Sequence, residues 1–314
     1  MAQATGIRAA TAIDVVESAY RLDGSESAWL AALLEQASRD LDTGSGVYAF
    51  TGNDSAPDFA SSPVFVQRHL TPEFLSRIAT LNAEAPNAIF ELLRKRLVTC
   101  GGLEQVLGAS SPIVAHFRGL MADAGIADGF CMFAQDGRGG SVTLSAPSRE
   151  VVSPPPRVRG IWQRVGLHVV AGLRLRRLLA ASTARRDALL SPTGAVEDAI
   201  ATIADDDDAR RALADAVRSM EQARLASIRS SPDRALELWQ GLVAGRWSLV
   251  DHWERDGRRY VAAYSNPLGS RDPRGLTPTE QSVLRYLGLG ATNKEVSYAL
   301  GLSEKTVSSS VTQI

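Results

Sequence analysis

The sequence predicts an α+β protein that ends in an all-α domain, and three observations support this fold class. Two runs of apolar and β-branched residues, at 129–145 and 247–264, flank Asp-Gly turns and therefore predict β-hairpins. Apolar residues at helical spacing predict helices before, between and after these hairpins. Residues 276–314 contain three helical patterns and no strand pattern. This grouping favours an antiparallel sheet with packed helices, followed by a separate helical domain.

Composition limits the possible functions without choosing one. The chain has 314 residues, 45% of them hydrophobic and 22% charged, which is enough for two or three globular domains. The formal net charge is −1, so any nucleic-acid contact needs a local basic patch. We find no apolar run of membrane-spanning length and no secretion signal, and we expect a cytoplasmic protein. Cys100 and Cys131 are expected to be free thiols, with a disulfide or redox switch as the alternative.

The first half of the chain is expected to comprise a weakly structured tail, residues 1–24, with a short helix over 13–20, and one domain, residues 25–181. The elements expected in this domain are an amphipathic helix from Ser27, strands over 47–51 and 64–66, helices over 72–81, 87–97 and 113–121, the hairpin over 129–145, and a helix over 159–181. An antiparallel sheet with helices in this order resembles a GAF or PAS sensor domain. The resemblance implies a small-molecule pocket between sheet and helices. No residue is assigned to a ligand, and a filled core with only a dimerisation role is the alternative.

The helix that ends this domain is basic at its end. The residues concerned are Arg174, Arg176, Arg177, Arg185 and Arg186. A solvated face or a helix that couples to the next segment explains them better than a nucleic-acid surface, because no aromatic residues alternate with them.

Residues 182–270 are predicted to form a helical linker with one β-hairpin, including a short helix over 191–203. The four carboxylates of Asp205–Asp208 fit a helix start better than a metal site, because consecutive residues on a helix point in different directions. The next helix carries apolar residues at spacings of four and three. They are Ala209, Leu213, Ala216, Met220 and Ala223. We favour a dimer helix for this seam, with packing on the neighbouring domain as the alternative.

The last segment, residues 271–314, has well-marked helix ends. Thr277 with Glu280, and Thr292 with Glu295, have the spacing of capping boxes for two helices. Gly301 is expected to end the second helix, and Ser303 to cap a third. Two helices joined by a short glycine-containing turn are typical of a helix-turn-helix.

The sequence also predicts which side of each of these helices faces inward. The expected core residues are Val283, Leu284, Leu287, Val296, Ala299, Leu300, Val307, Val311 and Ile314. The other side of the third helix is polar. A small helical bundle with a solvated polar face would give the same pattern.

Three spaced motifs decide between these two interpretations. They are Leu-Thr-x-x-Glu at 276–280, Thr-Asn-Lys-Glu-Val at 292–296 and Leu-Gly-Leu-Ser-x-x-Thr-Val at 300–307. Together they resemble the LuxR-type (GerE-like) DNA-binding domain, which implies a tetrahelical domain that binds double-stranded DNA as a dimer. In a helix-turn-helix the second helix lies in the major groove. The expected DNA-binding residues are Lys294 and Lys305 on phosphates, and Thr306, Ser308, Ser309, Thr312 and Gln313 in the groove.

This sequence departs from the family pattern in two ways. Ser308, Ser310 and Thr312 stand where family members often have basic residues or a histidine. The sequence also stops at Ile314, before the family's fourth helix, so we expect that the chain is truncated. The charges of the segment cancel, which predicts weak DNA binding by this segment alone. Auxiliary phosphate contacts are expected from Arg258, Arg259, Arg271 and Arg274.

We therefore expect a dimeric transcription regulator whose sensor domain responds to an unknown ligand or partner. A protein-interaction module whose helix-turn-helix does not bind DNA is the alternative. We do not expect an enzyme, because the sequence has no phosphate-binding, dinucleotide, nucleophile-elbow or zinc-protease motif. The four histidines have no metal-ligand spacing, and His168 is expected to be a core residue. No cofactor or metal is predicted.

Overall fold

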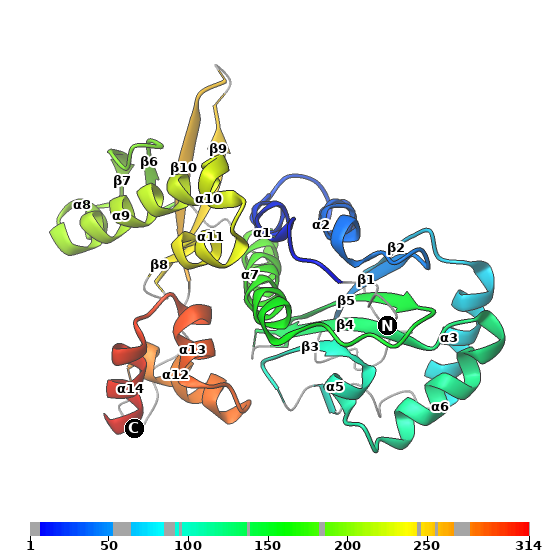
Figure 1. The fold of residues 1–314 in the computed structure, drawn as a ribbon. Helices are drawn as coiled ribbons and strands as arrows, with labels where there is room; N and C mark the ends of the chain where they lie inside the picture. The colour runs from blue at the N-terminus through cyan, green and yellow to red at the C-terminus, as the bar shows by residue number, and fades with distance from the viewer. Residues whose placement is uncertain are drawn as a thin grey trace. The chain divides into compact units, whose positions relative to one another are not determined.

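In the computed structural model, the chain forms two compact units (Figure 1). The structure describes residues 7–52, 64–84, 92–93, 96–136, 139–181, 186–243, 246–254, 257–266 and 277–313. The first unit comprises Met1–Ala19 and Asp23–Leu173, and the second comprises Tyr20–Leu22 and Arg174–Ile314. The division into four segments stays a prediction.

The first unit is built on a five-stranded sheet with the order β2-β1-β5-β4-β3, in which neighbouring strands are antiparallel. The strands are β1 (Val47–Gly52), β2 (Val64–Arg68), β3 (Val98–Gly102), β4 (Asp128–Gln135) and β5 (Ser141–Ser148). The helices are α1 (Ala12–Ala19), α2 (Glu26–Leu41), α3 (Pro72–Glu84), α5 (Leu103–Leu107), α6 (Pro112–Met121), the 3₁₀ turn η1 (Ala122–Ala124) and α7 (Pro156–Ala181), whose residues from Arg174 on belong to the second unit. This confirms the predicted mixed α+β class with an antiparallel sheet. The helix predicted over 87–97 falls mostly outside the described residues.

Helices pack on both faces of this sheet. On one face, apolar side chains at helical spacing on α3 meet those of α6. The cluster comprises Phe74, Ile78, Leu81, Phe117, Met121 and Ile126, with Tyr48 of β1 packed against it. On the other face, Trp162 of α7 meets Phe130 of β4 edge to face, with ring centroids 5.9 Å apart. Gly166 of α7 lies so close to Met132 that an added Cβ would be 3.1 Å from its sulfur. A helix can approach a sheet this closely because glycine has no side chain.

The N-terminal residues from 7 to 22 are more ordered than predicted. Ile13, Val15 and Val16 of α1 are at most 1% exposed, and the Trp162 indole donates a hydrogen bond of 2.7 Å to the carbonyl of Arg8. Helix α1 confirms the short helix expected over 13–20, and the bounds of the N-terminal tail stay a prediction. A helix of eight residues is marginal by itself, and tertiary packing supplies its stability.

The second unit contains another five-stranded antiparallel sheet where the sequence predicted a helical linker with one hairpin. Its strands are β6 (Ala188–Leu190), β7 (Val196–Ala199), β8 (Leu242–Val243), β9 (Trp247–Trp253) and β10 (Arg259–Ser265). Its helices before the C-terminal domain are α8 (Ala201–Ala204), α9 (Asp207–Arg224), α10 (Ala226–Arg229) and α11 (Pro232–Leu238). Of these five strands, only β9 and β10 were predicted. The helix predicted over 191–203 is wrong for most of its length, because β7 occupies 196–199 and only residues 201–203 are helical, in α8.

Both sheets have the same strand order. The second runs β7-β6-β10-β9-β8, so in each sheet the first hairpin lies beside the last strand, and the third strand is at the far edge. Residues 47–148 and 188–265 thus repeat one topology, although the sequence shows no internal repeat.

The apolar seam of α9 packs inside its own unit. Ala209, Leu213, Ala216, Met220 and Ala223 are each at most 2% exposed. The dimer-helix interpretation of this seam is therefore wrong, since the chain itself buries these side chains. The predicted helix start is confirmed, because the Asp206 side chain accepts hydrogen bonds from the backbone N–H groups of Asp208 and Ala209.

A half-buried charge network fixes the end of α9 to the sheet. Arg224 and Arg259 each contact Glu221 and Asp251, at distances between 2.5 and 3.2 Å. Burial raises the pKa of Glu221, but hydrogen bonds and charge from the two arginines outweigh burial and leave its pKa below the usual value. The network stabilises the fold above the ordinary glutamate pKa, and this contribution disappears as the pH falls through the lowered pKa.

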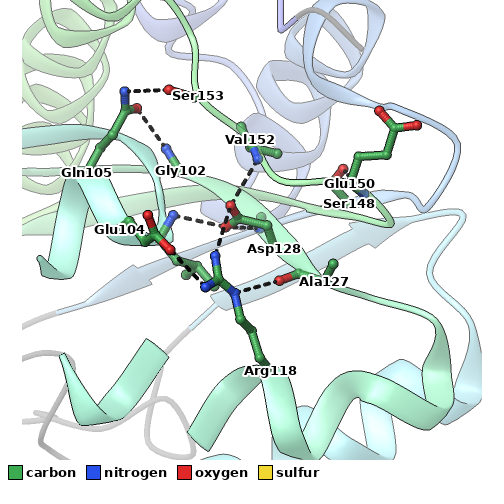
Figure 2. A network of polar contacts seen from close by, with 12 residues as sticks. Gly102, Glu104, Gln105, Arg118, Ala127, Asp128, Ser148, Glu150, Val152 and Ser153 are labelled. Atoms are coloured by element: carbon green, nitrogen blue, oxygen red, sulfur yellow. Dashed lines mark hydrogen bonds and ion pairs between the residues drawn. The ribbon is translucent and has the colours of Figure 1, made fainter. Parts of the chain in front are cut away.

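A second polar network lies at the start of β4 in the first sheet (Figure 2). Asp128 at the start of β4 is fully buried, and its carboxylate accepts hydrogen bonds from the N–H groups of Leu103 at 3.0 Å, Gly129 at 2.7 Å and Val152 at 2.9 Å. Arg118 of α6 lies 3.8 Å from the same carboxylate and donates to Glu104 at 2.8 Å. One buried carboxylate thus joins the start of α5, β4 and the segment that precedes α7.

We predict that Asp128→Ala destabilises the first unit by about 3–5 kcal/mol, because it leaves three buried N–H groups without an acceptor. Denaturant unfolding monitored by tryptophan fluorescence would measure this. Asp123→Ala is the matched control, since its side chain is 81% exposed and its ion pair with Arg77 is worth less than about 1 kcal/mol. Equal unfolding midpoints for the two variants would contradict the assigned role of Asp128.

Candidate nucleic-acid interface

The C-terminal domain consists of α12 (Pro278–Gly288), α13 (Asn293–Leu300) and α14 (Glu304–Gln313). Local side chains determine where the first two helices begin. The Thr277 hydroxyl accepts a hydrogen bond from the N–H of Glu280 at 3.3 Å, and the Glu280 carboxylate accepts one from the N–H of Thr277 at 2.7 Å. Thr292 and Glu295 repeat this arrangement with the same two distances. Both predicted capping boxes are confirmed.

The turn between α13 and α14 follows from two residues. Gly301 adopts a left-handed conformation, with φ 65° and ψ 29°, which costs glycine little. The Ser303 hydroxyl then accepts a hydrogen bond of 3.0 Å from the N–H of Thr306 and caps α14. Two helices are thus joined by residues 301–303, in the arrangement of a helix-turn-helix.

One valine from each helix forms the centre of this domain. Val283, Val296 and Val307 are fully buried. Tyr286, Ala299 and Leu300 extend this core, each at most 6% exposed. The predicted inward side is confirmed for Val283, Val296, Ala299, Leu300 and Val307, whereas Leu287 is only partly buried.

The prediction of the core is wrong for two residues. Leu284 and Val311 are each 40% exposed, and Ser310 is buried in place of Val311. The inward side of α14 therefore runs from residue 307 to residue 310, which are three positions apart, and Val311 lies one position beyond it. Ile314 lies outside the described residues.

Most of the predicted DNA-contacting side chains are exposed. Lys305, Thr306, Ser308, Ser309 and Thr312 of α14 are exposed. Lys294, in the first turn of α13, is also exposed, and Gln313 is described only as the last helical residue of α14. Their contact with DNA stays a prediction.

One contact on this side was not foreseen. The Asn293 amide donates a hydrogen bond of 3.3 Å to the Ser308 hydroxyl. It joins the first turn of α13 to the middle of α14, and therefore helps to fix the angle between them. The asparagine of the Thr-Asn-Lys-Glu motif was the feature of the sequence that could have indicated this contact.

Two of the negatively charged side chains of the domain form hydrogen bonds at the beginnings of its own helices. Side-chain and backbone hydrogen bonds from Thr277 lower the pKa of Glu280, so this carboxylate stays ionised at neutral pH. Glu280 and Glu295 lie in first helical turns, where the helix dipole favours negative charge. Lys305 also lies in a first turn, where a cation is not favoured, so helix stability does not explain its position.

One of the arginines expected to contact phosphates is held within its own unit. Arg259 donates hydrogen bonds to Glu221 at 2.8 Å and to Asp251 at 3.2 Å, and its contact with phosphate stays a prediction. Its guanidinium is already paired with two carboxylates. Arg271 and Arg274 lie outside the described residues.

One histidine and the two cysteines that the sequence singled out are described in the structure. Burial and the nearby Arg164 guanidinium lower the pKa of His168 to about 3, so this histidine is a neutral core residue. Cys100 and Cys131 are free, and burial raises the pKa of both thiols, that of Cys131 to about 12. In the described parts of the chain, no group of three or more histidine, cysteine or acidic residues could hold a metal ion. None of the described helices is long and apolar enough to cross a membrane.

We predict that Thr292→Val destabilises α13 by about 1 kcal/mol, because the N–H of Glu295 loses its capping acceptor. Amide hydrogen exchange within α13 would measure the change as a loss of protection of about fivefold. Thr279→Val is the matched control, since Thr279 lies inside α12 and caps no helix. If both substitutions leave α13 equally protected, the capping box does not hold this helix.

Comparison with known proteins agrees with this geometry. Residues 274–314 match the family described as bacterial regulatory proteins, luxR family. The comparison with curated proteins found no match. The family match includes all three helices and the turn, and it does not extend to residues 25–181, for which the GAF or PAS resemblance stays a prediction. Residues 274–314 are therefore a helix-turn-helix domain of the luxR family of bacterial regulatory proteins.

Proposed function

We propose that this protein is a DNA-binding transcription regulator that reads the major groove with α14. The observation that carries this proposal is the orientation of α14. Val307 and Ser310 fix it to the domain core, while its lysine and hydroxyl side chains are exposed. In a helix-turn-helix this is the side of the second helix that meets base edges and phosphates.

The exposed side chains have separable roles in this proposal. Lys294 and Lys305 contact phosphates, because ammonium groups bind phosphate without regard to base sequence. Thr306, Ser308, Ser309, Thr312 and Gln313 contact base edges, because hydroxyl and amide groups donate and accept hydrogen bonds. The position of Lys305 at the positive end of α14 supports its role, since a bound phosphate provides the anion that this end favours.

The charge balance of the domain supports binding by more than one copy. Arg285, Lys294 and Lys305 are matched by Glu280, Glu295 and Glu304. Each phosphate contact contributes through release of counterions, so one copy with few net cations binds weakly. A homodimer on a two-fold site doubles the contacts. Because the α9 seam is buried, the dimer contact must use another surface.

We also propose that the first unit supplies the regulatory input. It is compact and separate from the unit that holds the helix-turn-helix, as expected for a sensor. Its α3 and α6 side chains form a packed apolar cluster against the sheet. This packing is compatible with a response to a partner protein as well as with a small-molecule ligand. We assign no catalytic residue.

A protein-interaction module that does not bind DNA is the second candidate. The balanced charge of the domain favours it, as do the exposed apolar side chains of Leu284 and Val311. Single apolar side chains are common on protein surfaces, so the balanced charge is the stronger argument for this candidate. The two candidates differ in whether binding to double-stranded DNA depends on salt.

We predict that Lys305→Ala weakens DNA binding about fivefold to tenfold on all sequences and reduces the slope of log K against log salt by about 1, the loss of one phosphate contact. A salt-titrated fluorescence anisotropy assay with double-stranded DNA would measure both quantities. Arg211→Ala is the matched control, because it also removes one exposed positive charge but lies on α9.

An unchanged salt slope for Lys305→Ala would remove this residue from the interface. If the unsubstituted chain does not bind DNA even at low salt, the protein-interaction module becomes the better description.

A further inference from the structure

We propose that Tyr286 and Tyr298 dock the helix-turn-helix onto its own unit through two contacts that both lead back to the segment Tyr20–Leu22, so that this segment, with Tyr20 at its start, controls the position of the reading helix α14. The docking itself is a property of the second unit. Its regulatory meaning rests on the proposed DNA-binding function.

The first contact joins α13 to α11. The Tyr298 hydroxyl donates a hydrogen bond of 2.9 Å to the carbonyl of Leu236. Leu236 lies in the last turn of α11, where carbonyl groups have no partner within the helix. Leu236 is fully buried, so this carbonyl needs a partner from elsewhere in the unit. Tyr298 therefore satisfies a group that would be costly to leave unpaired.

The end of α11 leads directly to Tyr20. Trp239, which follows α11, stacks on the Tyr20 ring with centroids 6.5 Å apart and an interplanar angle of 28°. Both side chains are at most 4% exposed. Gly241 leaves room for the same ring, since an added Cβ would lie 2.6 Å from the Cζ atom of Tyr20. Tyr20 is thus held by the residues that follow the carbonyl bound by Tyr298.

The second contact joins α12 to α7. The Arg174 guanidinium donates a hydrogen bond of 3.3 Å to the Tyr286 hydroxyl. Two residues further along α7, Arg176 donates a hydrogen bond of 2.8 Å to the carbonyl of Arg21, which follows Tyr20 in the chain. The end of α7 therefore holds Tyr20–Leu22 and one helix of the DNA-binding domain together.

These contacts explain why Tyr20 is a suitable control point. The segment Tyr20–Leu22 belongs to the second unit, but the residues on both sides of it belong to the first. A movement of α1 against α2 must therefore move Tyr20 through the covalent chain. Trp239 and Arg174 would follow, and each is linked to one tyrosine of the helix-turn-helix. We call the contacts of Tyr286 and Tyr298 the dock. The exposed polar side chains of α14 are not among these contacts, so the dock orients α14 without covering it.

Hydrogen exchange on the full chain tests the dock. The double variant Tyr286→Phe/Tyr298→Phe removes only two hydroxyl oxygens, and it should increase exchange in α12 and α13 about fivefold or more. Tyr20→Leu should increase exchange in the same two helices, although it changes no residue of either. Tyr260→Phe, which deletes the same atom from a partly buried tyrosine of β10, is the matched control and should leave both helices unchanged.

The outcomes separate the dock from the proposed function. Unchanged exchange in α12 and α13 in both Tyr20→Leu and the double variant would overturn the dock, whatever the DNA affinity. If Tyr20→Leu does not fold, as judged by circular dichroism, the double variant alone decides. DNA affinity of the same samples should differ at least threefold between Tyr20→Leu and Tyr260→Phe. Equal affinities with altered exchange would overturn control by Tyr20, and no DNA binding by the unsubstituted chain would overturn the proposed function instead.

Discussion

The burial of one valine from each of α12, α13 and α14 is the constraint on which the candidate interface depends. Val283, Val296 and Val307 are fully buried, and β-branched side chains have few rotamers, so they fix the three helices with little freedom. Because the side of α14 that carries Val307 faces inward, the opposite side must face solvent. The core therefore determines which side chains are presented, and the hydroxyl and lysine groups need no support of their own.

Hydrogen bonds to backbone groups at helix ends complete this arrangement. Short helices leave a large share of their N–H and C=O groups without partners, and α13 has only eight residues. Thr292 and Glu295 satisfy the beginning of α13, and Gly301 allows its end to close. Tyr298 applies the same principle between elements, because it pairs with an orphan carbonyl of α11. The domain is thus held at helix ends, both within itself and against its own unit.

Local signals in the sequence were sufficient for the C-terminal domain and insufficient for the second sheet. Capping boxes and the glycine turn act over three or four residues, so the sequence alone predicts them. Strands β6, β7 and β8 have three, four and two residues, too few for an alternating pattern. Their pairing depends on distant partners such as β10, which local spacing cannot reveal. The misplaced Val311 has a related cause, because tertiary contacts decide which side of α14 faces inward.

The seam of α9 illustrates the same limit for function. Apolar residues at spacings of four and three fit a dimer helix and an internal helix equally well, and only the sheet beneath α9 decides between them. The half-buried ion pairs of Arg224 and Arg259 also indicate an internal helix, because they join the end of α9 to Asp251 of β9.

The repeated strand order of the two sheets gives the chain two similar scaffolds with different connections. In the second unit, the strands and helices of residues 188–265 precede the helix-turn-helix along the chain. The chain crosses between units after Ala19, after Leu22 and after Leu173. The first two crossings enclose Tyr20, and the third directly precedes Arg174, whose guanidinium reaches Tyr286. Every covalent path from the first unit therefore enters the second at Tyr20–Leu22 or at Arg174. If the first unit is the sensor that we propose, its signal has no other covalent route to the helix-turn-helix than these two places.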